Sequence, residues 1–258
     1  MSVAFEVKDV TADTSFELQH FPSGLFESDE QVAQFANALE AWCTVSTPTV
    51  VSVREILMID DRDLVLITDL PKGEPLRERL KTHNLWSPKE AVGLARELLG
   101  GLATLHERGL VHGDIKPNSI FVEGEGLELN AQMIDGGVTT GLWMAKDLGD
   151  KTALIGTPYY APAEQFGGDS PNVQSDLYNV AAVLFELIAG SLPWTGRNFL
   201  EVFQAKIAPT VASLRQVARD VEISDALESA VTKGVQADPH NRFKSATDFL
   251  AALEGATK

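Results

Sequence analysis

One segment of the chain, residues 175–189, is apolar on nearly every side of the helix that its spacing predicts. The apolar positions in it are Leu177, Val180, Ala181, Ala182, Val183, Leu184, Phe185, Leu187 and Ile188. A helix that is hydrophobic all round has to be buried all round. Gly190 is suited to end this helix, and Pro193 prevents its continuation. The chain therefore needs other elements around it, which predicts a sizeable helical unit.

The part of the chain from residue 87 onward predicts further helices. Residues 87–90, Ser-Pro-Lys-Glu, form a good helix start, with a serine cap, proline at the first position and glutamate at the third. We expect this helix to run to about Glu107 with one apolar face. A last helix is expected over residues 245–255.

The first part of the chain predicts mainly strands. Four short segments are rich in β-branched or aromatic side chains and typical of strands, at residues 3–8, 15–21, 50–58 and 64–70. Residues 28–43 carry apolar side chains at helical spacing. We therefore expect an α+β fold in which a small β-rich lobe, residues 1–70, precedes a larger helical lobe, residues 71–258.

Charge and composition exclude several classes of partner and site. The chain of 258 residues has a formal net charge of −16, so nucleic acids and anionic membranes would repel it. A single cysteine, Cys43, excludes an internal disulfide framework and fits a reducing compartment; we expect it half-buried in a helix. No apolar run reaches membrane length, and no signal peptide is visible. We expect a cytoplasmic protein, or the cytosolic domain of a longer one, without membrane insertion.

Five short motifs follow one another in the second part of the chain. They read HGDIKP at residues 112–117, MIDGG at 133–137, GTPYYAPAE at 156–164, SDLY at 175–178 and DPHNRF at 238–243. In this order and from about residue 90 to 254 they resemble the motifs of eukaryotic-type Ser/Thr protein kinases as bacteria carry them. The resemblance implies a two-lobed protein-kinase-like fold.

The resemblance also implies roles for single residues. Asp114 stands at the place of the base that accepts the substrate proton, and Lys116 at the place of a lysine that steadies the transferred phosphate. Asp135 stands at the place of the magnesium-binding aspartate. Three positions are implied to be structural beside His112: Glu164 and Arg242 as a buried ion pair, and Asp176 as an acceptor for the catalytic-loop backbone.

Other positions in the helical lobe depart from the kinase pattern. Ser119 stands where the family has the asparagine that holds a second magnesium ion, and the asparagine is one place early, at Asn118. A serine hydroxyl can bind magnesium, so Ser119 stays a candidate ligand. Gly136 replaces a phenylalanine that packs under the regulatory helix, and we expect glycine to loosen the backbone there. Gly113 replaces an arginine that would bind a phosphate on the activation segment.

The small lobe departs further from the family. Gln19 aligns with the lysine that pairs the nucleotide phosphates, and Glu17 with a small residue that lies on the adenine. The glutamate partner of that lysine falls near Ala38, with Glu40 or Gln34 as the alternatives. The remaining candidate nucleotide-binding positions are Ile67, Asp69, Ser119 and Phe121.

No glycine-rich loop is visible, because Gly24 is the only glycine before residue 73. The lobe is therefore truncated, and we expect the chain to begin in the second strand of the kinase fold. Two alternatives stay open: Lys8 reaches the phosphates from the neighbouring strand, or the glycine-rich strand lies upstream in a longer protein. The second alternative would restore the loop without placing a lysine at position 19.

The activation segment holds four threonines that are candidate phosphate acceptors, Thr139, Thr140, Thr152 and Thr157. In one interpretation they are polar loop residues, with Thr157 bonded to the catalytic loop. In the other, an active kinase phosphorylates one of them. A phosphothreonine-reading domain would then be a second type of partner.

These observations lead to a hypothesis of function with two alternatives. We expect a pseudokinase that serves as a protein-binding scaffold and has no cofactor. The first alternative is a weak Ser/Thr kinase that uses ATP and magnesium through Asp114, Lys116 and Asp135. The second is an inert nucleotide sensor. The dismantled phosphate site favours the scaffold, since phosphoryl transfer depends on positioning and charge neutralisation.

Overall fold

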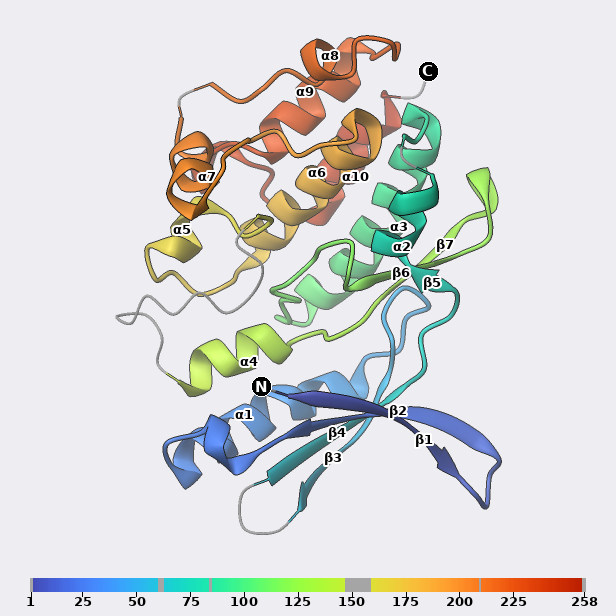
Figure 1. Cartoon of the computed structure of the whole chain (residues 1–258), viewed down its shortest axis with the longest axis vertical. Coiled ribbons are helices and arrows are strands. Elements are labelled where there is room, and N and C mark those ends of the chain that lie inside the picture. The colour runs from blue at the N-terminus through green and yellow to red at the C-terminus, as the bar shows by residue number, and fades with distance from the viewer. Residues whose placement is uncertain (1, 60–62, 84, 147–158, 209, 257–258) are drawn as a thin grey trace.

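The computed structural model describes residues 2–59, 63–83, 85–146, 159–208 and 210–256. They form the two-lobed kinase-like fold that the sequence predicts, with a small antiparallel sheet and its helix at one end and a larger set of helices at the other (Figure 1). Thr152 and Thr157 lie outside the described residues. Within the described residues, no helix is both long and apolar enough to cross a membrane.

A four-stranded antiparallel sheet makes up most of the small lobe. Its order is β1-β2-β4-β3, so β1 and β3 are its edges. The strands are β1 (Val3–Asp9), β2 (Thr14–Phe21), β3 (Val53–Ile59) and β4 (Asp63–Asp69).

Helix α1 (Asp29–Glu40) covers one face of this sheet. Its start is capped by the Ser28 hydroxyl, which accepts the backbone N–H of Gln31. Phe35 of α1 packs edge-on against Phe21 of β2 with ring centroids 4.9 Å apart. Two short 3₁₀ turns flank the helix, η1 (Ser23–Leu25) and η2 (Ala41–Thr44). Cys43 lies exposed in the second turn, so the expectation of a half-buried helical cysteine is wrong.

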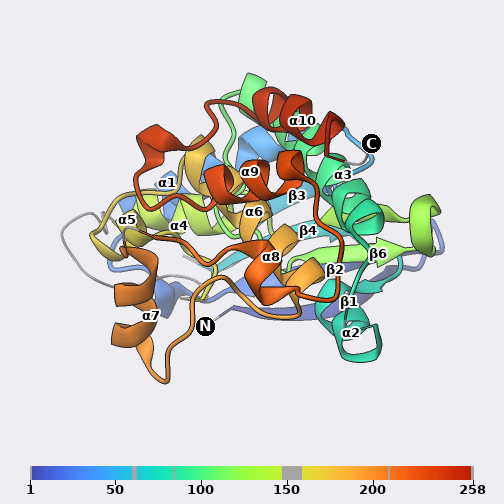
Figure 2. The ribbon, with the colours of Figure 1, turned by 90° about the horizontal axis from the view of Figure 1, so that it is seen from above.

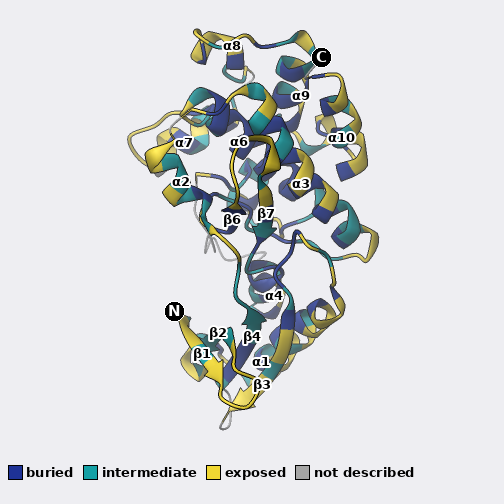
Figure 3. Ribbon diagram, turned by 90° about the vertical axis from the view of Figure 1, so that its right-hand side faces the viewer, coloured by how far each residue is buried: buried dark blue, intermediate teal, exposed yellow. Residues whose placement is uncertain are grey.

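The helical lobe is built around α6 (Val173–Ala189), which packs against α3, α8 and α9 (Figure 2). Almost every residue of α6 is buried, as its sequence predicts (Figure 3). The helix begins two residues earlier than expected because Asn172 is its cap. Asn172 accepts the N–H of Ser175 at 3.1 Å, and the Ser175 hydroxyl accepts the N–H of Asn172 at 2.8 Å. Gly190 ends the helix in the left-handed conformation, with φ of 71°.

Helix α3 (Pro88–Glu107) has the capping box predicted from Ser87 and Glu90. The other helices of this lobe are α2 (Leu76–Thr82), α4 (Val138–Ala145), α5 (Ala163–Phe166), α7 (Phe199–Lys206), α8 (Leu214–Val217), α9 (Asp225–Gly234) and α10 (Ala246–Glu254). A second sheet has the order β5-β6-β7, with β5 (Glu74–Pro75), β6 (Ile120–Glu123) and β7 (Asn130–Met133). Two further 3₁₀ turns are η3 (Gly126–Glu128) and η5 (Pro239–Asn241).

Candidate active site

The loop before β6, residues 112–119, is held in place by hydrogen bonds to the first turn of α6. The wholly buried carboxylate of Asp176 accepts the backbone N–H groups of His112 at 2.9 Å and Gly113 at 2.8 Å. The Nε2 atom of His106 lies 3.0 Å from the same carboxylate. Burial lowers the pKa of His112, which is fully enclosed. A buried acceptor that satisfies several donors at once holds this loop in one shape.

Asp114 and Lys116 project from this loop and are bound to each other. The Lys116 amine donates to the Asp114 carboxylate, and each side chain keeps about a fifth of its surface exposed, 21% and 18% for Asp114 and Lys116. Both groups lie near Asp135, because each acts on the charge of that carboxyl group. Their pairing means that a substrate hydroxyl or phosphate has to compete for each of them.

Ser119 and Asn118 turn in opposite directions. The Ser119 hydroxyl is buried; it accepts the N–H of Lys116 at 3.1 Å and lies 2.7 Å from the Asp114 carbonyl, to which it donates. Asn118 is exposed, and its amide oxygen accepts from Arg77 at 3.4 Å. The hydroxyl of Ser119 thus closes the loop on itself, which removes it as the magnesium ligand that the sequence allowed.

Asp135 stands in the cleft after β7 in the left-handed backbone region, with φ of 60°. Such a conformation is uncommon for a residue other than glycine. Burial, then the carboxylates of Glu17 and Asp114, raise the pKa of Asp135 to about 6, and Lys116 opposes this rise. A carboxyl in this position resists ionisation unless a cation accompanies it.

The two glycines after Asp135 are covered by an aromatic ring that sequence reasoning missed. A Cβ atom on Gly136 or Gly137 would overlap the indole of Trp42, which is 3% exposed and follows α1. The ring also meets His112 edge-on, with centroids 6.4 Å apart. The space beside Gly136 is therefore not empty, because Trp42, in the turn η2 directly after α1, fills it. The two adjacent glycines were the sequence signal for this contact, because glycine lets another group come close to the backbone.

Helix α4 begins directly after this glycine pair and packs against α1 (Figure 1). At Gly141 an added Cβ would lie 3.1 Å from a Phe35 ring carbon and 3.4 Å from the Ala38 Cβ. The face of α1 that was expected to supply a glutamate partner thus presents Ala38 to α4. Glu40 and Gln34, the alternatives, are exposed.

The same helix accounts for two of the candidate phosphate acceptors. Thr139 is 7% exposed. The Thr140 hydroxyl donates to the Val111 carbonyl at 3.3 Å and occupies the space next to Gly113, where a Cβ would overlap it. Thr139 is therefore not accessible to a second kinase in this conformation, whereas Thr140 is half-buried and stays a prediction.

On β2, Glu17 and Gln19 lie on the face of the sheet that looks toward α1 and the cleft, termed the cleft face. Phe21 shares this face by alternation and contacts α1. Gln19 bonds the Ser2 hydroxyl at 3.3 Å, and burial raises the pKa of Glu17. Glu17 is also near enough to Asp135 to act on its charge. Where the resemblance implies a lysine and a small residue, the cleft has an amide and an acid.

Two expected nucleotide contacts point the other way. Ile67 pairs with Leu18, whereas Glu17 pairs with Thr68, and residues that pair directly share a face. Ile67 therefore lies on the opposite, outer face. Asp69 is on that face too, and its carboxylate accepts two hydrogen bonds from Arg54, both 2.6 Å long.

Two more positions can be compared with expectation. Phe121 is half-buried on β6, between Pro75 and Gln132 of the neighbouring strands.

Lys8, the alternative source of positive charge, lies at the exposed end of the β1–β2 hairpin. Its amine is 2.5 Å from the Asp13 carboxylate. This pairing uses the charge of Lys8 locally.

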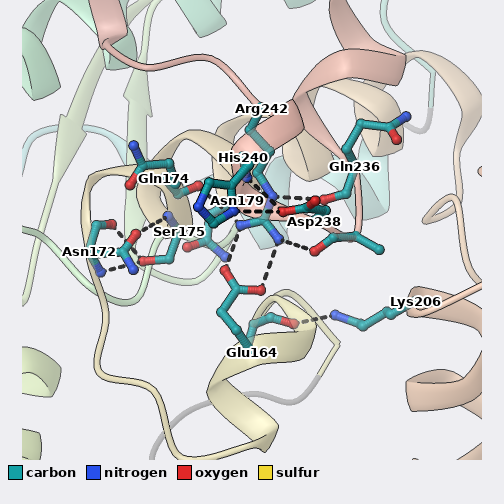
Figure 4. Close-up of polar contacts among 12 residues, drawn as sticks. Glu164, Asn172, Gln174, Ser175, Asn179, Lys206, Gln236, Asp238, His240 and Arg242 are labelled. Atoms are coloured by element: carbon teal, nitrogen blue, oxygen red, sulfur yellow. Dashed lines mark hydrogen bonds and ion pairs between the residues drawn. The ribbon is translucent and has the colours of Figure 1, made fainter.

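Arg242 and Glu164 meet in the interior of the helical lobe (Figure 4). Arg242 Nη1 and Nη2 donate to the two carboxylate oxygens of Glu164 at 2.6 and 2.9 Å. The remaining donors reach the carbonyls of Gln236 and Ala237 at 2.7 and 2.9 Å, and the guanidinium lies 4.5 Å from the centroid of the Tyr178 ring. These contacts satisfy a fully buried cation.

A second buried basic side chain, Lys206 of α7, was not anticipated. Its amine donates to the carbonyls of Tyr159 at 2.8 Å and Ala161 at 2.5 Å, and it stands 4.2 Å from the centroid of the Trp194 ring (Figure 4). Burial lowers the pKa of Lys206 to about 6, while the carboxylate of Glu164 opposes this. No sequence signal distinguishes this lysine, because its neighbours come from distant segments.

A third network ties α2 to α6. Arg77 donates to the Tyr160 hydroxyl and, at 3.1 Å, to Glu186. The Tyr160 hydroxyl donates to the other Glu186 oxygen at 2.5 Å. The end of the activation segment is therefore held by two networks, one through Lys206 and one through Arg77.

The cleft keeps Asp135 and Lys116, but other positions that would hold a magnesium–nucleotide group differ from the kinase pattern. Among the described residues, no three His, Cys, Asp or Glu side chains are arranged to hold a metal ion. Asp135 is present, but the Ser119 hydroxyl is used by its own loop. The cleft face of β2 supplies a carboxylate and an amide where phosphates require cations.

Comparison with known proteins agrees with the fold and the motif order. The protein kinase domain family matches residues 5–252. The serine/threonine-protein kinase PkaB of Streptomyces coelicolor is 34% identical over 195 residues, covering 74% of this chain and 46% of that protein. The serine/threonine-protein kinase PrkC of Bacillus subtilis is 23% identical over 256 residues, covering 99% of this chain and 38% of that protein.

The chain thus spans less than half the length of these curated relatives. Among solved structures, the PknI kinase domain of Mycobacterium tuberculosis superposes with a TM-score of 0.72 at 17% sequence identity. That match covers 98% of this chain and 89% of the PknI chain, and it shows the shared fold. The chain belongs to the protein kinase domain family, and these relatives are bacterial Ser/Thr protein kinases.

Proposed function

We propose that this chain is a pseudokinase: a kinase fold that binds a protein partner and does not transfer phosphate. The observation that carries the proposal is the cleft face of β2. Glu17, which is near Asp135, and Gln19 stand there at positions where the kinase resemblance implies a small residue and a lysine. A triphosphate would meet carboxylates instead of cations.

The size of the effect supports loss of transfer rather than a mild reduction. Each charge-assisted hydrogen bond to a phosphate contributes about 1.5–3 kcal/mol. Replacing the lysine and adding a carboxylate removes one such bond and introduces repulsion. At about 1.4 kcal/mol per tenfold in rate, two or three such terms slow transfer by several powers of ten.

The face of α1 supports the same proposal. Where the kinase resemblance implies a glutamate that pairs with the phosphate-binding lysine, α1 presents Ala38 to α4. The lobes are proposed as residues 1–70 and 71–258, and the location as cytoplasmic, either as a separate protein or as the cytosolic domain of a longer one.

The test is a thermal melt of the purified chain with and without millimolar ATP and magnesium. A ligand that binds only the folded chain raises its stability by RT ln(1 + [L]/Kd). We expect no shift, and no transfer of the γ-phosphate to a generic protein substrate. Transfer that disappears in Asp114→Asn would overturn the proposal and establish a weak kinase.

The weak-kinase alternative rests on one observation: Asp114 and Lys116 are retained, and Asp176 anchors their loop.

The nucleotide-sensor alternative makes a different prediction. A thermal shift with ATP and magnesium, without any transfer, would support it. That shift should then be reduced by Asp135→Ala.

A further inference from the structure

Strand β1 is an edge strand of the sheet, and among the described residues no strand pairs with its free edge. The sheet order is β1-β2-β4-β3, and β1 pairs only with β2 there. Almost all of β1 is exposed, including Val3 at 49% and Phe5 at 53%. An exposed edge strand offers a row of backbone N–H and C=O groups to another chain.

The two faces of β1 differ in chemistry. Val3, Phe5 and Val7 alternate onto the outer face of the sheet. Phe5 and Val7 are paired there with Leu18 and Phe16 of β2, which form a short apolar strip next to the edge. Farther from the edge the face is mixed, because a cavity of about 510 Å³ is lined by Val7, Phe16 and Ile67 together with polar residues that include Glu55 and the Arg54–Asp69 pair. An added strand with apolar side chains on this side would extend the strip and cover its edge.

The cleft face at the same edge is acidic. Glu6 of β1 is directly opposite Glu17 of β2. Like charges in directly opposed positions destabilise a sheet. The single basic residue of β1, Lys8, is paired with Asp13. A cation placed beside Glu6 would therefore relieve a repulsion that is present in this structure.

The charge of the surrounding segment decides between two types of occupant. Among residues 1–31 the only basic residue is Lys8, and the acidic residues are Glu6, Asp9, Asp13, Glu17, Glu27, Asp29 and Glu30. A second copy of the chain would bring the same acids to the edge and would be repelled. A basic segment is attracted.

We propose that β1 binds an extended segment of a partner protein as a fifth strand, and that this segment alternates apolar and basic residues. Its backbone pairs with β1, its apolar side chains lie beside Val3, Phe5 and Val7, and a lysine or arginine reaches Glu6. Strand addition of this kind takes affinity from the main chain and specificity from alternate side chains. The proposal deepens the protein-binding function above by naming the class of partner.

The probe is a synthetic decapeptide of alternating valine and lysine with a fluorescent label, titrated with the whole chain without nucleotide. A peptide of alternating valine and glutamate controls for charge. A valine–lysine peptide N-methylated at alternate residues controls for backbone pairing, since it keeps the composition and charge. We expect binding of the first peptide alone, with slower amide exchange in Val3–Asp9.

Two pairs of variants make the test specific. Glu6→Gln should weaken binding of the valine–lysine peptide about tenfold, because it removes a charge-assisted contact. Glu27→Gln should leave this binding unchanged, because Glu27 is an exposed acid outside the sheet. Phe5→Ser should also weaken binding, and Leu127→Ser, equally a change of an exposed apolar residue, should not. A thermal melt of each variant checks that it is folded.

Several outcomes would overturn the proposal. They are no binding of the valine–lysine peptide, equal binding of its N-methylated form, or equal weakening by Glu6→Gln and Glu27→Gln. The last two would show attraction to overall charge only. A dimer in sedimentation that Phe5→Ser dissociates would assign the edge to a second copy. Peptide binding that is lost in a longer form of the chain with an upstream segment would assign the edge to a strand of the same protein. Because no nucleotide is present, failure here is distinguishable from failure of the pseudokinase proposal, which the ATP melt and transfer assay decide.

Discussion

The indole of Trp42 lies so close to the backbone at Gly136 that a side chain at this position would overlap the ring. This contact joins the end of the α1 segment to the start of the activation segment. The kinase resemblance implies a phenylalanine at position 136, and here an aromatic ring from another part of the chain occupies the space beside the glycine.

We predict that Trp42 and Gly136 are energetically coupled. Trp42→Ala should lower the free energy of unfolding by about 3–5 kcal/mol, because it empties a buried aromatic site. Gly136→Ala should be destabilising in the wild-type chain and much less so in the Trp42→Ala background. Urea unfolding of the four proteins measures this. Gly24→Ala is the control, since a Cβ there meets nothing within 4 Å; equal costs of Gly136→Ala in both backgrounds would contradict the coupling.

The Arg242–Glu164 pair should be essential for stability. Arg242→Met leaves the Glu164 carboxylate buried without its partner, and breaking one side of such a pair costs about 3–5 kcal/mol. The matched control is Lys81→Met, whose pair with Glu78 is more than half exposed, 63% and 53%. Its cost should stay below about 1 kcal/mol. Denaturant unfolding measures both, and a similar small cost at the two sites would contradict the prediction.

Lys206 should give the stability a characteristic pH dependence. Its pKa is lowered to about 6 in the folded chain, from an ordinary value of 10.5. The unfolded chain therefore binds more protons than the folded chain between these values, and the free energy of unfolding rises with pH in that window. The charges that face the amine are Glu164 and Arg242.

Removing the amine should flatten this rise. We expect Lys206→Met to lose stability relative to the wild-type chain as the pH increases from 6 to 9, measured by denaturant unfolding at each pH. Lys233→Met is the control, because Lys233 is exposed and lies over the Phe243 ring at 4.5 Å. An unchanged pH profile in Lys206→Met would show that this lysine stays charged when buried.

Restoring positive charge to the cleft should restore part of the nucleotide site. The double variant Glu17→Ala, Gln19→Lys removes one carboxylate and adds one cation on the cleft face of β2. We expect a thermal shift with magnesium-ATP that the wild-type chain lacks, measured at several nucleotide concentrations. Glu27→Ala with Gln34→Lys makes the same charge change at exposed positions and should produce no shift. A shift of the same size in that control would show that bulk charge, and not the cleft, determines binding.

Local patterns in the sequence predict much of this fold for identifiable reasons. The all-apolar segment that became α6, the Ser87–Glu90 capping box and the alternation of the strands each depend on neighbours a few residues apart. The motif order indicates the catalytic loop, and Asp176 anchors that loop in the structure. These features are readable because short-range chemistry decides them.

The errors arose where the answer depends on register or on distant contacts. Ile67 was expected in the cleft, but a shift of one residue in a strand moves a side chain to the opposite face. Ser119 was a candidate magnesium ligand, but its hydroxyl donates to the Asp114 carbonyl of its own loop. Thr139 was expected in an accessible segment, and it is buried in α4.

The sequence by itself determined the protein kinase family, the two kinds of lobe and the absence of a lysine at position 19, because these follow from residue identity and local periodicity. Only the tertiary structure decided that Trp42 fills the site beside Gly136, that Lys206 is buried under the activation segment, and that β1 is an edge with one apolar and one acidic side. The physical reason is that these features join residues far apart in the chain, and packing, not local propensity, brings them together.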